Sequence, residues 1–278
     1  MNNPDISIII PCYNSGKYLL EAIQSVEYYQ GQNKYEIVVI DDGSTDIQTM
    51  SILNELDQKK CIVLHQENKG PGAARNAGCR RASACFLLFL DSDNKIYSTY
   101  IDAGISYLKN NSDVGVVHGK PTFFGDTSRN GFKTGPFEID KVLAINYIDM
   151  CAVVRKSAWE SIEGFDESRE LIGREDWEFW IRIYRKGWKF FFLDEVMFFY
   201  RIRNNSLMST HEINQNNNLY VYRKHYDLLS DQYINTCFKI MELKKDLRWS
   251  IRYHLKNAVT TLRYISSIIT LYILNIKF

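Results

Sequence analysis

Short apolar runs alternate with segments of helical spacing throughout residues 1–118, and this alternation constrains the fold more than any other feature. Runs rich in β-branched residues are typical of strands, whereas apolar residues that recur every three to four positions are typical of helices. The pattern predicts an α/β fold, with a mostly parallel sheet flanked by helices on both faces. The expected strands are 6–10, 36–40, 61–64, 85–90 and 114–117, with helices over 19–26 and 70–82.

The pattern is less regular in residues 119–210. The stretch Phe123 to Ile139 is rich in Gly, Pro and polar residues, which predicts a long loop of a kind that is often functional. The remaining expected elements are a strand over 147–154, a helix over 175–184 and two closing strands over 189–193 and 196–200.

A helical appendage is expected over 211–278, after a domain over 1–210 whose halves are 1–118 and 119–210. Residues 247–278 combine an apolar stripe with several basic residues and no Asp or Glu. Two interpretations are open. The segment packs on the domain or mediates a homodimer, or it forms an amphipathic helix that lies on an anionic membrane surface.

Charge, cysteine content and hydropathy argue against several classes of protein. A net charge of +1 argues against a surface built for nucleic acid, which needs a local excess of Lys and Arg. The 6 cysteines form no CxxC pair and are typical of reduced core thiols in a cytosolic protein. The first residues show no basic region before their short apolar stretch, so we expect no signal peptide, and no run reaches the roughly 18 to 20 apolar residues that a membrane span needs. We therefore expect a cytoplasmic protein, with peripheral contact at the inner face of the membrane as the alternative.

Four polar clusters follow the expected strands at their carboxyl ends. They are Pro11 to Asn14, Asp41 to Asp46, Lys69 to Gly72, and Asp91 to Asp93. In an open parallel sheet, ligands bind at the carboxyl ends of the strands, so the sequence predicts a ligand site there.

The triplet Asp91-Ser92-Asp93 is the sharpest of these features. In an extended backbone, residues two apart point to the same side, so Asp91 and Asp93 would face one site. Two close carboxylates repel, and a hard cation such as Mg²⁺ or Mn²⁺ between them relieves that repulsion. The alternative is a simple turn, because Asp, Ser and Asn94 are favoured turn residues.

Together these residues resemble glycosyltransferase family 2, a group with the GT-A (Rossmann-like) fold. The resemblance covers about the first three-quarters of the chain and does not extend past His211. The matching stretches are 7–14, 39–46, Asn68 to Gly78 (NKGPGAARNAG), 89–93, 164–167 (GFDE) and 175–178 (EDWE).

The resemblance implies a role for individual residues. Pro11 and Tyr13 would lie against the nucleobase, and Asp42 would accept a hydrogen bond from its ring N–H. Arg75 is equally suited to a structural ion pair. The positions implied for the nucleotide-sugar site are Pro11, Tyr13, Asp42, Lys69, Gly70, Arg75, Asp91 and Ser92.

The remaining implied roles concern the metal and the reaction. Asp93, with Asp91, would hold Mn²⁺ or Mg²⁺, and His211 is a candidate further ligand. Asp176, with Glu175 beside it, would supply the catalytic base. A position at the start of a helix weakens Asp176 as a base, whereas Glu175 and burial by neighbouring Trp residues strengthen it.

The implied activity is inverting transfer of a sugar from a nucleoside diphosphate donor, a UDP-sugar above all, to an acceptor hydroxyl. The acceptor would be a saccharide or a lipid-linked saccharide, in surface polysaccharide or glycolipid synthesis. A nucleotide-sugar-binding protein without catalysis is one alternative. A nucleotidyltransferase is disfavoured because Pro11 to Asn14 replaces the Gly-rich phosphate loop, and a Rossmann dehydrogenase because no GxGxxG follows the first strand.

Overall fold

The computed structural model describes residues 3–57, 61–126, 131–203, 211–231, 233–236 and 266. The chain divides into two compact units, Met1–His225 and Tyr226–Phe278. The first unit includes α8 and so runs past position 210. Apart from Ser266, the basic segment 247–278 lies outside the described residues. None of the described helices is long and apolar enough to cross a membrane.

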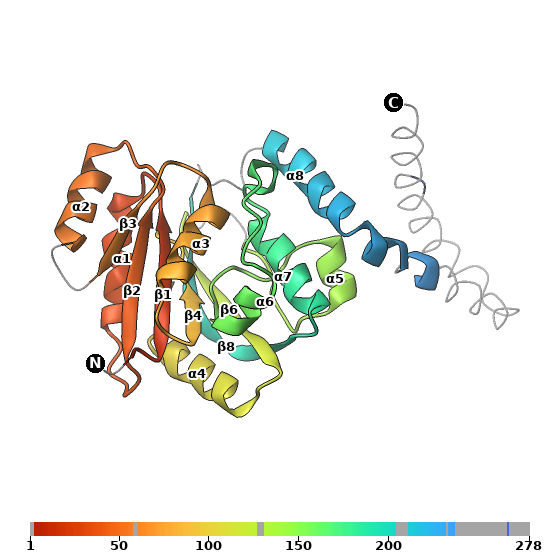
Figure 1. The fold of residues 1–278 in the computed structure, drawn as a ribbon, viewed down its shortest axis with the longest axis horizontal. Coiled ribbons are helices and arrows are strands. Elements are labelled where there is room, and N and C mark those ends of the chain that lie inside the picture. Colours follow the sequence, from red (N-terminus) through yellow and green to blue (C-terminus); the bar gives the residue numbers. More distant parts are fainter. Residues whose placement is uncertain are drawn as a thin grey trace, which may run out of the picture. The chain divides into compact units, whose positions relative to one another are not determined.

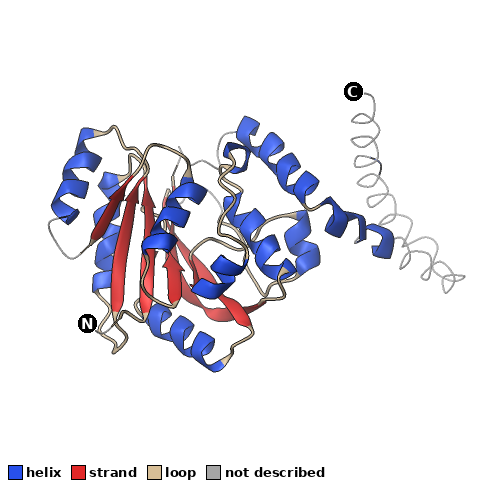
Figure 2. Ribbon diagram, viewed as in Figure 1, coloured by secondary structure: helices blue, strands red, loops and turns tan. Residues whose placement is uncertain are grey.

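A single sheet of eight strands forms the centre of the first unit, in the order β3-β2-β1-β4-β7-β6-β8-β5 (Figures 1 and 2). The strands are β1 (Ile6–Cys12), β2 (Tyr35–Asp41), β3 (Ile62–His65), β4 (Phe86–Phe89), β5 (Lys95–Ile96), β6 (Val114–Gly125), β7 (Ala152–Arg155) and β8 (Lys189–Ile202). The helices are α1 (Gly16–Glu27), α2 (Ile47–Asp57), α3 (Pro71–Arg81), α4 (Thr99–Asn110), α5 (Ile139–Ala144), α6 (Lys156–Ser161), the 3-10 turn η1 (Arg169–Leu171), α7 (Glu175–Arg185) and α8 (His211–Lys224).

Strand direction divides the sheet into two parts. Strands β3, β2, β1 and β4 are parallel neighbours, as are β6 and β8. Strand β7 runs antiparallel to both β4 and β6, and β5 runs antiparallel to β8. The expected α/β architecture is confirmed, and its parallel part carries the four polar clusters.

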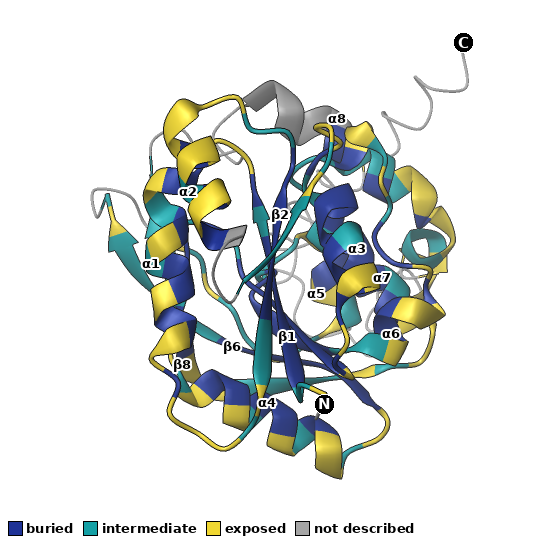
Figure 3. Cartoon of the chain, turned by 60° about the vertical axis from the view of Figure 1, so that its left-hand side comes forward, coloured by how far each residue is buried: buried dark blue, intermediate teal, exposed yellow. Residues whose placement is uncertain are grey.

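Helices cover both faces of the sheet, with α1 and α2 on one side and α3, α6 and α7 on the other (Figure 3). Ile8 and Ile10 of β1 join a buried core with residues of α1, α2 and α4. Ile9 points the other way, toward α3, where a Cβ on Gly78 would lie 2.7 Å from its Cγ2. Burial on both faces explains why this strand is apolar apart from Ser7, which donates to Glu36.

Four strands differ from the expected ones. Strand β1 continues through Pro11, although proline has no backbone N–H to donate. The pairing of β1 with β4 ends at Ile9, so Pro11 has no partner on that side and no hydrogen bond between the strands is lost. The two closing strands are one strand, β8, because register shifts opposite Gly119 and Lys120 absorb the polar residues Asp194 and Glu195. Strand β6 runs to Gly125, into the expected long loop, and β7 begins only at Ala152.

Candidate functional site

The four polar clusters meet at one edge of the sheet, as the sequence predicts. Their strands β3, β2, β1 and β4 are adjacent and parallel, so the carboxyl ends lie together. Asn14, after β1, accepts hydrogen bonds from the backbone N–H groups of Thr45 (2.8 Å) and Asp46 (3.0 Å), after β2. Tyr13 beside it is 48% exposed and free to contact a ligand.

Asp42 connects the end of β2 to the loop before α3. Its carboxylate accepts from the backbone N–H groups of Lys69 and Gly70, both at 2.9 Å, and from Gln66 Nε2 at 2.7 Å. A carboxylate has about four acceptor positions, so these three bonds leave one for a ligand. Gly70 has a φ of 91°, a backbone conformation that favours glycine.

Asp91 to Asn94 form a turn rather than an extended segment, so the extended backbone expected from the sequence is wrong here. The Asn94 N–H donates to the Asp91 carbonyl at 3.0 Å. The two carboxylates still interact, because the charge of Asp91 contributes, after burial, to raising the pKa of Asp93. Ser92 is buried, at 7% exposed.

Arg75, on α3, joins the strand-end turn to the start of α7. Its Nη2 lies 2.7 Å from Asp91 Oδ1, and its Nη1 lies 2.7 Å from Glu175 Oε1. The other oxygen of Glu175 accepts from the Gly173 N–H at 2.7 Å. Glu175 therefore has both oxygens occupied within the protein, and Arg75 forms the structural ion pair that the sequence left as an alternative.

Asp93 faces two arginines at the end of the last strand: Arg201 lies in β8, and Arg203 directly follows it. Arg203 Nε lies 2.7 Å from Asp93 Oδ2. Arg201 Nε donates to the Asp93 carbonyl at 2.9 Å. The sequence pattern did not identify either arginine, because they lie more than a hundred positions away from the triplet.

Asp176 lies in the first turn of α7. Its Oδ2 accepts from Asn146 Nδ2 at 2.8 Å, and its Oδ1 accepts from the Trp177 N–H at 2.7 Å. Burial, and then the neighbouring charge of Glu175, raise the pKa of the Asp176 carboxyl well above its ordinary value, although Arg75 opposes them. The two effects that strengthen Asp176 as a base therefore outweigh its position at a helix start.

Two residues that sequence reasoning missed, Asp149 and Tyr200, lie in the same place. Burial, and then the charge of Asp91, raise the pKa of Asp149. The pKa of Tyr200 is raised by burial and then by the charges of Asp149, Asp91, Asp93 and Asp176. All four acids are therefore close enough to one phenol to act on it electrostatically. The signal in the sequence is weak, because Asp149 follows no strand and belongs to no motif.

The turn at Gly164 is attached to α3 by one side chain. Asn76 Oδ1 accepts from the Phe165 N–H at 2.8 Å and from Trp159 Nε1 at 3.0 Å. Asn76 Nδ2 donates to the Phe165 carbonyl at 2.9 Å. Gly164 has a φ of 81°, and a Cβ there would lie 2.4 Å from Asn76 Oδ1, so only glycine fits.

Helix α8 contacts the same region through an ion cluster around the buried Glu178. Lys224 Nζ lies 2.5 Å from Asp166 Oδ2 and 2.8 Å from Glu178 Oε1. Glu178 is fully buried and also pairs with Arg182 at 2.7 Å. Burial disfavours its charge, but His225, Arg182 and Lys224 outweigh that effect and lower the pKa of Glu178 to about 2.

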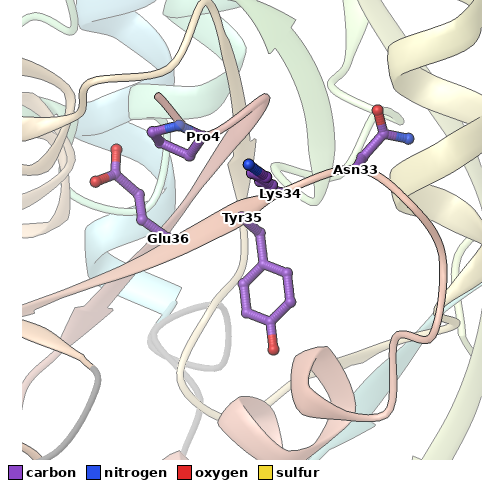
Figure 4. Close-up of a pocket in the computed structure, with 5 residues that line it drawn as sticks. All are labelled: Pro4, Asn33, Lys34, Tyr35 and Glu36. Carbon is purple, nitrogen blue, oxygen red and sulfur yellow. The ribbon is translucent and has the colours of Figure 1, made fainter. Parts of the chain in front are cut away.

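A shallow depression lies at the start of β1 and β2, away from the strand ends that carry the site (Figure 4). It is lined by Pro4, Asn33, Lys34, Tyr35 and Glu36. The four acids do not line it, and it is unrelated to the predicted ligand site.

No group of three or more His, Cys, Asp or Glu residues within the described ranges is placed to hold a metal ion. Asp91 and Asp93 therefore form a candidate metal site with two carboxylates and no third such ligand among the described residues. The side chain of His211, the candidate further ligand, lies outside the described residues.

Comparison with known proteins gives a consistent match. The sequence model of glycosyl transferase family 2 matches residues 7–162, which is more than half of the chain. An uncharacterized glycosyltransferase of Rickettsia conorii is 39% identical over 113 residues, 40% of this chain and 18% of the relative. TuaG of Bacillus subtilis, a putative teichuronic acid biosynthesis glycosyltransferase, is 27% identical over 80% of this chain and 88% of its own. The chain thus spans less than a fifth of the Rickettsia relative.

Solved structures share the fold. S. aureus TarS 1-349 in complex with UDP-GlcNAc has a TM-score of 0.61 at 23% identity, over 74% of this chain and 61% of that one. The mannosyltransferase PcManGT of Pyrobaculum calidifontis, in complex with GDP-Man and Mn²⁺, has a TM-score of 0.56 at 18% identity, over 74% and 59%. These likenesses show the fold, and each solved chain extends well beyond the matched part.

Proposed function

The chain belongs to glycosyl transferase family 2, and on that premise we propose that it transfers a sugar from a nucleoside diphosphate donor to an acceptor hydroxyl, with inversion. The observation that carries this proposal is that Asp91 and Asp93, at the edge of the sheet where ligands bind, are linked to the start of the helix with Asp176 by Arg75, which contacts both Asp91 and Glu175. Asp91 and Asp93 belong to the turn after β4, and Asp176 belongs to α7. Acids on two separate elements suit a reaction in which each element contacts a different substrate.

Asp176 is the proposed general base. A base works best when its pKa lies near the working pH, and burial with the charge of Glu175 moves Asp176 in that direction. Asn146 donates to one oxygen of the carboxylate and so orients it. Asp176 would remove the proton of the acceptor hydroxyl as that oxygen attacks the anomeric carbon. Attack on the face opposite the leaving diphosphate inverts the centre.

The nucleotide would lie along the ends of β1 and β2. Tyr13 is exposed there, and Asp42 keeps one acceptor position for a nucleobase N–H. We propose a UDP-sugar as the donor, a proposal supported by the fold shared with TarS, whose structure is a complex with UDP-GlcNAc. The relation to TuaG supports an acceptor that is a saccharide or lipid-linked saccharide of a surface polysaccharide.

Asp91 and Asp93 are suited to hold Mn²⁺ or Mg²⁺. Hard cations of this size are commonly held by one or two carboxylates together with substrate phosphates, so a third protein ligand is not required. Arg75 and Arg203 each contact one oxygen of their carboxylate, so neither pair uses both oxygens. The bound cation would neutralise the charge that grows on the leaving diphosphate.

A thermal-shift screen of nucleotide sugars with and without Mn²⁺ tests the donor, because a ligand that binds the native state raises its stability. The stabilising donor is then incubated with saccharide acceptors, and the anomeric configuration of the product is read by NMR. We expect stabilisation by one UDP-sugar and an inverted product. A retained configuration would contradict the single displacement, and an absence of any nucleotide effect would contradict the donor site.

The segment 247–278 keeps both interpretations from the sequence, an anionic membrane contact or a contact within a homodimer. Liposome co-sedimentation separates them when the full chain is compared with one that ends at Asp246. Loss of sedimentation in the shorter chain supports the membrane contact. A change of oligomeric state without a change in sedimentation supports the homodimer.

A further inference from the structure

Arg201 and Arg203 lie two residues apart at the end of β8, and the protein holds them differently. Arg201 donates to three separate groups: its N–H to Asn94 Oδ1, its Nε to the Asp93 carbonyl and its Nη2 to Glu21 Oε2, each at 2.9 Å. Its guanidinium also lies 4.3 Å from the ring centre of Phe124. Two of these bonds hold the Asp91–Asn94 turn against β8, and the third ties the same guanidinium to α1.

Arg203 makes fewer contacts than Arg201 with the described residues. Its side chain is 35% exposed, against 13% for Arg201. Its Nε lies 2.7 Å from Asp93 Oδ2, yet Nε has no well-aligned hydrogen bond within the described part of the chain. The guanidinium lies 5.5 Å from the ring centre of Tyr18. The contact with Asp93 is an ion pair without directional bonding, which is easily exchanged for another partner.

Asp93 needs a cation at this position. Its side chain is only 15% exposed, and a buried carboxylate is costly unless it is paired. Arg203 provides that charge in the protein alone. A divalent cation bound to the same carboxylate would stand within a few ångströms of the guanidinium, and two positive charges at that separation repel strongly. Arg203 and the divalent cation therefore compete for Asp93.

An arginine that leaves Asp93 would remain beside the donor's diphosphate. The planar guanidinium carries five N–H donors in a fork that matches phosphate oxygens, and its charge is permanent. We propose that Arg203 is an exchangeable counter-ion of the donor site, which neutralises Asp93 in the empty protein, is displaced by the divalent cation and then binds the diphosphate of the donor. This inference rests on the proposed function.

Two binding measurements with opposite expected signs test the exchange. The variant Arg203→Gln keeps a polar, although shorter, side chain and removes the charge. Mn²⁺ binding without nucleotide, followed by EPR, should tighten about tenfold, because a competing cation is gone. UDP binding at saturating Mn²⁺, followed by calorimetry, should weaken about tenfold, which is the loss of one charge-assisted hydrogen bond.

Three further variants make the result specific. Arg203→Lys keeps the charge but not the fork, so Mn²⁺ binding should stay near wild type while UDP binding weakens. Lys189→Gln, which removes an exposed cation paired with Asp113, should change neither measurement. Arg201→Gln should weaken both, because it loosens the turn that carries Asp93.

Several outcomes would overturn the exchange. If Arg203→Gln binds Mn²⁺ no more tightly than wild type, the two cations do not compete. If it binds UDP as tightly as wild type, Arg203 is not a diphosphate ligand. If both measurements weaken, as for Arg201→Gln, the residue has a structural role only. A wild-type protein that binds no UDP at all would instead contradict the proposed function, so the two failures are distinguishable.

Discussion

Arg75 Nη2 lies 2.7 Å from Asp91 Oδ1, although Arg75 belongs to α3 and Asp91 to the turn that follows β4. The same guanidinium contacts Glu175, at the start of the helix that carries Asp176. One buried cation therefore sets the separation between the strand-end turn and the proposed base. The side chain is 4% exposed, so water does not substitute for either contact.

Replacing Arg75 by Met should destabilise the protein by about 3–5 kcal/mol, because two carboxylates would lose their shared buried partner. Urea unfolding at pH 7 measures the change. The matched control is Arg80→Met, one helical turn further along α3. Arg80 is 59% exposed and lies 3.6 Å from Glu167, so its loss should cost at most about 1 kcal/mol. Equal effects would show that Arg75 contributes no more than a surface ion pair.

Asp176→Asn should abolish transfer while donor binding stays near wild type. The amide keeps the size of the side chain and one of its two hydrogen bonds, from Asn146 or from the Trp177 N–H, but cannot accept a proton. Calorimetry with the donor and an assay of transfer separate the two properties. Normal turnover by this variant would remove Asp176 from the mechanism.

The pH dependence of activity should also report on Asp176. Burial and Glu175 raise its folded pKa, so the active, ionised form is lost as pH falls through a value well above that of an ordinary Asp, about 4. The profile of kcat/KM should therefore have an acid limb in that higher range. Stability depends on pH in the other direction. Because the fold disfavours the ionised carboxylate, Asp176 destabilises the native state increasingly as pH rises from the ordinary Asp pKa toward the raised one. Asp176→Asn should accordingly unfold at the same temperature as wild type at neutral pH, or higher, and an acid limb at the ordinary Asp value would contradict the raised pKa.

Asp93→Asn should lose the part of donor binding that depends on a divalent cation. The amide is a poorer ligand for a hard cation than a carboxylate, and it also loses the pair with Arg203. UDP titrations with Mn²⁺ and with EDTA measure the difference, which should fall to near zero. Asp113→Asn, a surface acid paired with Lys189, is the control and should leave the difference unchanged.

The parallel half of the fold could be predicted from the sequence because β1, β2 and β4 are largely buried and so leave apolar runs, and the partly buried β3 is also mostly apolar. The Asp41 and Asp91 clusters then follow at their carboxyl ends without further information. Strand β8 could not be read correctly, because Asp194 and Glu195 interrupt its pattern while a register shift keeps it intact. Local patterns do not encode such tertiary compensation.

The site was predictable only where it is built from local motifs. Asp42, Asp91 and Asp176 each stand in a recognisable run of neighbours. Asp149 and Arg203 belong to no sequence motif. They reach the site because the adjacent strands β7 and β8 pair with other strands of the sheet. Their part in the site is a property of the assembled sheet. The interaction of Arg75 with Asp91 is intermediate, since both residues lie in motifs but their pairing is long-range.

Replacing Glu178 tests how much its ion pairs with α8 and α7 stabilise the protein. It is fully buried, and Lys224, Arg182 and His225 surround it at 2.8, 2.7 and 3.3 Å. Glu178→Gln should lower the free energy of unfolding by about 3 kcal/mol at pH 7, because Lys224 and Arg182 lose the buried carboxylate that they share. The exposed Glu138→Gln, which breaks a surface pair with Lys141, should cost less than about 1 kcal/mol.

The same change should depend on pH in a defined direction. The folded pKa of Glu178 is lowered to about 2, below its ordinary value of 4.5. The stabilisation is therefore complete above the ordinary value and is lost as pH falls from there toward 2. Urea unfolding of wild type and Glu178→Gln at pH 7 and again near pH 3 should show the difference between them shrinking. A difference that stays constant across this range would mean that packing rather than charge accounts for the stabilising effect of Glu178.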